Sequence, residues 1–250
     1  DRGSFVKDII SDNIMLGDIY MRAKELRVAT DVSRGIFAIR ALQKGESVPT
    51  ETIQAMFPDR QNDFVLSVGE GDVVLIRQLL DGAGSKELNK TAAQIEEALR
   101  VNGESTVVVG MGTIAMHLRD LAKSYKEAQI AIEVGKVFDT EKYIINYENL
   151  GIGRLIYQLP IPLCKMFIRE IFGGKSPDDF DEETLTTIYK FFENSLNVSE
   201  TSRQLFIHRN TLVYRLDKLQ KSTGLDLRVF EDAITFKIAL MVVKYMKYME

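Results

Sequence analysis

Residues 197–216 read NVSETSRQLFIHRNTLVYRL. Asn197 is suited to cap a short helix, and Glu200, three residues later, completes a capping-box pattern. The run Phe206-Ile207-His208 allows a turn, and a second helix follows with leucines at positions 212, 216 and 219 on its buried side. Two short helices joined by such a turn are typical of a helix-turn-helix.

The outward face of the second helix is polar and basic. Between Arg203 and Lys221 there are five positive residues and one acid, a local charge of +4 in a chain whose net charge is −4. Arginine can donate two parallel hydrogen bonds to guanine, asparagine can form a pair of hydrogen bonds with adenine, and a threonine methyl can contact thymine. We expect base contacts from Arg209, Asn210, Thr211, Tyr214 and Arg215. Phosphate contacts are expected from Ser199, Arg203, His208, Lys218 and Lys221. The alternative is an ordinary solvated basic face on a small helical bundle.

Upstream of residue 150 the sequence alternates between helical and strand patterns. Helical spacing of apolar residues runs from Phe5 to Leu26, with Ser4 as the expected cap. Two β-rich runs around residues 69–72 predict a hairpin. The remaining predicted elements are strands at 35–42, 105–109 and 143–146, and helices at 50–57, 88–101 and 115–134. This alternation favours an α/β or α+β sandwich with helices over one sheet.

Beyond residue 150 only helical patterns occur. We therefore expect a leading signal or dimer helix at 1–28, a sandwich domain at 29–150, a helical linker at 151–180 and an all-helical domain at 181–250. The last helix has an apolar stripe that is expected to be core, with a dimer contact as the alternative. Its residues are Ile234, Ile238, Met241, Val242, Tyr245 and Met249.

Composition limits the remaining classes. The chain has 250 residues, 45% of them hydrophobic, and a single cysteine, Cys164, which excludes an internal disulfide and a multi-cysteine zinc site. Residues 236–249 are too short and too lysine-rich to span a bilayer, and residues 1–7 do not resemble a signal peptide. We expect a cytoplasmic protein with no cofactor, no metal and no membrane contact. Because the sequence does not begin with methionine, we expect it to be a fragment or processed chain that lacks an upstream domain.

Residues 197–216, together with Thr223-Gly224-Leu225-Asp226-Leu227, closely resemble the helix-turn-helix signature of the PucR/CdaR family of bacterial regulators. Residues 124–128 and 147–151 resemble the end of that family's middle domain, and 22–26 its beginning. That domain is a divergent relative of the GGDEF fold of diguanylate cyclases. Ser202 departs from the alanine common in the family, and Phe206 stands where many other helix-turn-helix proteins have glycine.

The resemblance implies an α+β protein, with a GGDEF-like α/β sandwich followed by an all-α helix-turn-helix domain. It also implies a sequence-specific transcription regulator that binds double-stranded operator DNA as a homodimer or higher homo-oligomer. Its targets would be catabolic genes, such as those for sugar diacids or purines. The metabolite signal would be sensed by an N-terminal region that is absent from this chain.

The alternative is a nucleotide-binding or nucleotide-cyclising enzyme on the GGDEF-like domain. Residues 68–72 superficially resemble the cyclase loop, but such chemistry needs converging carboxylates, and Arg40 stands where a metal-binding acid is wanted. Glu70 and Asp72 are interpreted as turn residues. We therefore predict no catalytic residues. A pure interaction module is a third class, compatible with DNA binding.

Three further features have simpler interpretations than a reactive site. Gly110-Met111-Gly112 lacks the third glycine and the lysine of phosphate loops, and a strand-to-helix turn explains it equally well. His117 is expected on a helix with a local hydrogen bond, and Cys164 as a buried thiol.

Overall fold

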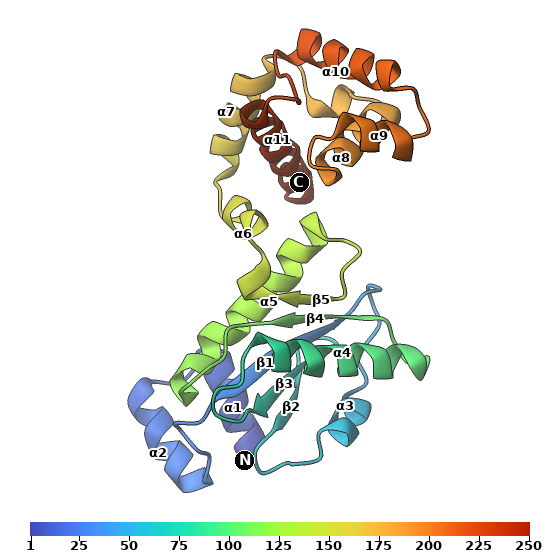
Figure 1. The fold of residues 1–250 in the computed structure, drawn as a ribbon. Helices are drawn as coiled ribbons and strands as arrows, with labels where there is room; N and C mark the ends of the chain where they lie inside the picture. The colour runs from blue at the N-terminus through green and yellow to red at the C-terminus, as the bar shows by residue number, and fades with distance from the viewer. The chain divides into compact units, whose positions relative to one another are not determined.

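Five strands form the sheet of the first 152 residues in this computed structural model, which describes residues 1–250 and every side chain except that of Asp178. They are β1 (Arg34–Ala41), β2 (Phe64–Val68), β3 (Asp72–Gln78), β4 (Val107–Met111) and β5 (Ile144–Asn146). Their order is β2-β3-β1-β4-β5, and every pairing is antiparallel except that of β4 with β5 (Figure 1). The predicted hairpin of β2 and β3 is confirmed, with Gly69 and Gly71 at positive φ in its turn.

Helices cover both faces of this sheet because β1 is apolar on both sides. Ile36 and Ala38 face one core, and Phe37 and Ile39 face the other. The first core is covered by α1 (Arg2–Ile10), α2 (Leu16–Leu26) and α5 (Leu121–Phe138). The second is covered by α3 (Thr50–Met56) and α4 (Ser85–Val101) (Figure 1). Short 3₁₀ turns lie at Leu118–Asp120 and Tyr147–Asn149.

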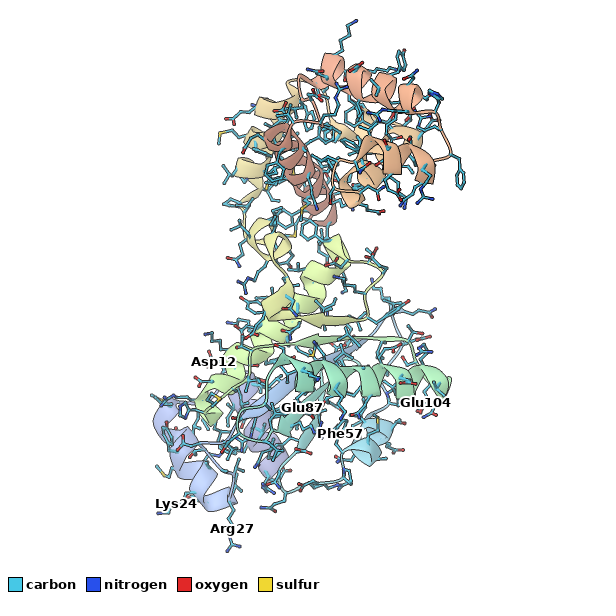
Figure 2. The ribbon with its side chains drawn as sticks, in the orientation of Figure 1. Asp12, Lys24, Arg27, Phe57, Glu87 and Glu104 are labelled. Atoms are coloured by element: carbon cyan, nitrogen blue, oxygen red, sulfur yellow. The ribbon has the colours of Figure 1, made fainter. Side chains whose placement is uncertain are left out.

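The prediction of one continuous helix over Phe5–Leu26 is wrong. The chain breaks between α1 and α2, and Asp12 in this break and Arg27 after α2 have φ values of 58° and 55° (both labelled in Figure 2). Asp1, not Ser4, caps α1, because its carboxylate accepts from the Ser4 backbone N–H at 2.6 Å. Phe5 is fully buried in the first core. This segment therefore packs on the sheet, and the signal or dimer role expected for it stays a prediction.

The helix predicted from residue 115 begins at Leu121, and His117 precedes it in extended backbone. The expected local hydrogen bond of His117 is a further error, because its Nδ1 lies 2.7 Å from Oδ1 of Asp31, 86 residues away.

Six helices make up the second unit, residues 153–250, and the first of them begins one residue earlier, at Ile152. They are α6 (Ile152–Tyr157), α7 (Ile161–Phe172), α8 (Glu182–Glu193), α9 (Val198–Gln204), α10 (Arg209–Thr223) and α11 (Phe230–Tyr248), with a 3₁₀ turn at Pro177–Asp179. Their core is centred on Phe191, Phe236 and the leucines of α10. In the part of the chain that is described, no helix is long and apolar enough to cross a bilayer.

The region expected as a linker supplies part of this core. Phe172 is buried in it, and Phe167 packs against it from the same helix, so α7 is an integral part of the second unit. Cys164 on α7 is buried as predicted, and burial raises the pKa of its thiol. The stripe predicted for α11 is only partly correct, since Val242 is buried but Ile234 is exposed.

Candidate nucleic-acid interface

The start of α9 is held by the predicted cap. Oδ1 of Asn197 accepts from the Glu200 backbone N–H at 2.9 Å. The Glu200 carboxylate does not return to the cap residue, but accepts from Arg203 and from Gln204, the latter at 3.0 Å. These side-chain hydrogen bonds hold the pKa of Glu200 below its usual range. The capping box is therefore only half formed.

The end of α9 forms a Schellman motif. The N–H of Phe206 donates to the Arg203 carbonyl at 3.2 Å, and that of Ile207 donates to the Ser202 carbonyl at 3.1 Å. Phe206 itself takes a φ of 56°. His208, two residues later, then caps α10, because its Nδ1 accepts from the Asn210 backbone N–H at 3.0 Å. The turn is thus fixed by backbone and side-chain hydrogen bonds on both sides.

One face of α10 is buried and the opposite face is open. The leucines at positions 212, 216 and 219 lie in the core, as predicted from their spacing. The exposed residues of the predicted set are Ser199, Arg203, His208, Arg209, Asn210, Thr211, Tyr214, Lys218 and Lys221. The fold brings these side chains to the start of α9, the turn and the outer side of α10.

Arg209 connects the starts of the two helices, because its Nη1 donates to Oγ of Ser199 at 3.0 Å. No acid among the described side chains forms an ion pair with Arg209, Lys218 or Lys221. The N-terminal end of α10 adds the partial positive charge of the helix dipole. This surface therefore suits an anionic partner.

Arg215 does not belong to this surface. Its side chain is only 26% exposed, its Nη2 lies 2.6 Å from the Glu183 carboxylate, and its Nη1 donates to Oγ1 of Thr187 at 3.0 Å. Successive helical residues are 100° apart, which places position 215 nearer to the buried leucines than Tyr214 is. The guanidinium of Arg215 thus has partners on α8, and the expectation that it reads bases stays a prediction.

Two supporting residues were not predicted. The Asn194 amide donates to Thr201 at 3.3 Å and to Gln204 at 3.1 Å, which joins the end of α8 to α9. Arg228 pairs with Asp217 at 2.7 Å and with Asp226 at 2.8 Å, and holds the pKa of Asp226 below its usual range. Asp217, the acid counted against the basic face, is thereby neutralised. No local spacing in the sequence indicates either contact.

The hairpin of the first unit was the alternative site. Asp72 is not a plain turn residue, because its Oδ2 accepts from Nε of Arg40 at 3.1 Å, and the other side of that guanidinium bonds to Glu133 at 2.8 Å. Glu70 is exposed in the turn. Among the described residues, no group of three or more His, Cys, Asp or Glu side chains is arranged to hold a metal ion. Arg40 therefore pairs with both carboxylates, those of Asp72 and Glu133.

Glycines 110 and 112, considered above as part of a phosphate loop, lie where α5 packs on β4. A Cβ added at Gly112 would overlap the Ser124 backbone carbonyl, and one added at Gly110 would overlap that of Ala128. Close packing of helix on strand accounts for both glycines.

Two family models match the chain. One describes a GGDEF-like domain and matches residues 12–134, and the other describes the PucR C-terminal helix-turn-helix domain and matches residues 184–242. Both matches agree with the division of the structure into a sheet unit and a helical unit.

Several curated proteins that are similar in sequence to this chain are named as regulators or transcriptional activators. The purine catabolism regulatory protein of Bacillus subtilis is 26% identical over 59% of this chain and 28% of its own length. The carbohydrate diacid regulator of Escherichia coli is 26% identical over 75% of this chain and 50% of its own length. The proline-responsive transcriptional activator PutR of B. subtilis is 30% identical over 55% of this chain and 34% of its own length. The chain thus spans half or less of the length of each of these relatives. With both of its units matched, the chain belongs to the PucR/CdaR family, as a GGDEF-like domain followed by a PucR-type helix-turn-helix domain.

Proposed function

We propose that this chain is a sequence-specific, DNA-binding transcription regulator whose reading element is the N-terminal half of α10. The observation that carries this proposal is the exposed group of donors along the outer side of α10. Arg209 and the two outer lysines have no acidic partner among the described side chains, although acids outnumber bases in the chain as a whole. Such a surface creates a positive local potential that attracts an anionic partner.

Each side chain has a role that follows from its chemistry. Arg209 and Asn210 are suited to paired hydrogen bonds with guanine and adenine, and Thr211 and Tyr214 to contacts with adjacent base edges. Phosphate contacts fall to Ser199, Arg203, His208, Lys218 and Lys221, which border this group. Arg203 would exchange its pairing with Glu200 for a phosphate oxygen.

The regulated genes, by analogy with the relatives, are catabolic. Those relatives are named for purine catabolism, carbohydrate diacids and proline response, so we propose that this chain controls breakdown genes in response to a small metabolite. It would act in the cytoplasm as a homodimer or higher oligomer, because paired half-sites about 34 Å apart multiply affinity and specificity. We propose no catalysis for the first unit, since Arg40 bonds to the carboxylates beside its hairpin.

Selection of genomic fragments by the purified chain tests this function. The wild type is compared with an Arg209→Ala, Asn210→Ala double variant and with Arg169→Ala, a control that removes an exposed arginine from α7. We expect the wild type and the control to enrich one shared, palindromic motif. The double variant should lose discrimination at its base pairs, at a cost of about 1–3 kcal/mol for each contact.

Two results would contradict the proposal. One is the absence of any enriched motif at moderate salt with folded protein. The other is equal enrichment by the double variant, which would remove α10 from base reading.

A further inference from the structure

Phe206 is the most exposed large apolar residue of the second unit. Its side chain is 95% accessible in the turn between α9 and α10, whereas the neighbouring Ile207 packs against the core. Of these two apolar residues of the turn, Ile207 therefore contributes to the core, whereas Phe206 is exposed to solvent. For an aromatic ring of this kind, contact with water is unfavourable compared with burial.

The backbone at Phe206 does not favour this residue either. Its φ of 56° lies in the left-handed region, at the position of the Schellman motif where glycine is most common. Glycine adopts this conformation without the steric cost of a Cβ. The backbone therefore favours glycine over phenylalanine at position 206, and no core contact of the ring offsets that preference. A contact outside the folded chain would give the ring a role.

The surroundings of the ring indicate the partner. Arg203 precedes it by three residues, and His208 and Arg209 follow two and three residues after it; all three are exposed. The turn also leads into the N-terminal end of α10, where the helix dipole favours anions. DNA matches this combination, because its phosphates alternate with the apolar surfaces of deoxyribose and of thymine methyl groups.

We propose that Phe206 is a DNA-contacting residue whose ring packs against deoxyribose and base surface at the edge of the groove that α10 enters. This inference rests on the proposed function of α10. The left-handed turn holds the ring at the rim of the basic surface, where a flexible or smaller side chain would not reach. The contact is apolar, so it adds affinity without releasing a counterion.

The salt dependence of binding separates this contact from those of the cations. Loss of a lysine–phosphate contact lowers the slope of log K against log salt by about one, whereas loss of an apolar contact lowers affinity at every salt concentration and leaves the slope unchanged. Removing the ring should weaken binding about tenfold, as expected for partial burial of a phenylalanine.

The test uses the full chain and its selected operator duplex, with affinity measured by fluorescence anisotropy over a series of salt concentrations. Phe206→Gly removes the ring and relaxes the turn, and Phe206→Asn removes it with a residue that also tolerates positive φ. Lys218→Gln is the matched electrostatic control. We expect both Phe206 variants to bind about tenfold more weakly with the wild-type salt slope, and Phe206→Gly to unfold at or above the wild-type temperature.

Three outcomes would overturn the inference. The first is wild-type affinity in both Phe206 variants while the wild type binds its operator, which leaves the proposed function standing. The second is a reduced salt slope in both variants, which would make the effect electrostatic. The third is a change of oligomeric state in sedimentation velocity that accounts for the loss, which would assign the ring to a second copy of the chain. Failure of the wild type to select any DNA would instead contradict the proposed function itself.

Discussion

The positively charged side chains of α10 differ in whether they have hydrogen-bond or ion-pair partners within the folded chain. Arg215 donates to Thr187 and pairs with Glu183, whereas Lys218 and Lys221 have no acidic partner among the side chains that are described. Thr187 is almost fully buried, with 1% of its surface accessible. The guanidinium of Arg215 therefore joins α8 to α10, and its removal acts first on the folded state.

At the residue scale we predict that Arg215→Ala lowers the free energy of unfolding by about 1–2 kcal/mol, because it removes one partly buried hydrogen bond and one partly exposed ion pair. Urea denaturation of the full chain measures this change. Arg169→Ala, which removes an exposed arginine from α7, should change stability by less than about 0.5 kcal/mol. Unchanged stability of Arg215→Ala together with relaxed selection at one base pair would restore Arg215 to the base-reading group.

At the scale of elements, α5 packs closely on the end of β4. The backbone of the helix reaches the strand at Gly110 and Gly112, where the Ala128 and Ser124 carbonyls occupy the space of a side chain. A backbone atom cannot move aside as the end of a flexible side chain can. The helix can therefore approach the strand this closely only because Gly110 and Gly112 have no Cβ.

We predict that Gly112→Ala destabilises the first unit by on the order of 3 kcal/mol, because α5 must move away from β4. Urea denaturation followed by circular dichroism measures the loss. Gly17→Ala is the matched control: it lies in α2 with open space around it, and alanine there should stabilise the chain by up to about 1 kcal/mol. Equal stability of the two variants would contradict the packing described here.

At the scale of the whole molecule, charge is distributed unevenly. The chain carries a net charge of −4, yet the outer side of α10 presents cations without acidic partners among the described side chains. Asp217, the acid on that helix, is occupied by Arg228. DNA therefore repels the molecule as a whole but attracts this one surface. We expect the electrostatic orientation of α10 toward DNA to depend strongly on ionic strength.

We predict that the double variant Lys218→Gln, Lys221→Gln binds all duplexes more weakly and lowers the slope of log K against log salt by about two. Its preference among sequences should remain that of the wild type, because phosphate contacts position the protein without reading bases. Lys237→Gln, which removes an exposed charge on α11, serves as the control with an unchanged slope. A wild-type slope in the double variant would remove both lysines from the interface.

By itself the sequence determined the features that depend on local periodicity. Two β-rich runs around a glycine-containing turn identified the hairpin of β2 and β3, and the leucine spacing identified the buried face of α10. The cap at Asn197 follows from the same local rules. In each case the deciding interaction lies within a few residues along the chain.

Only the tertiary structure decided the features that depend on distant partners. It showed that Arg215 pairs with α8, that Asp72 bonds to Arg40, and that the first helix ends at Ile10 and packs on the sheet through Phe5. It also left Phe206 without a partner in the fold. The physical reason is common to all four: charge, apolar character and helical spacing are local properties, whereas the availability of a side chain depends on which segments the folded chain brings beside it.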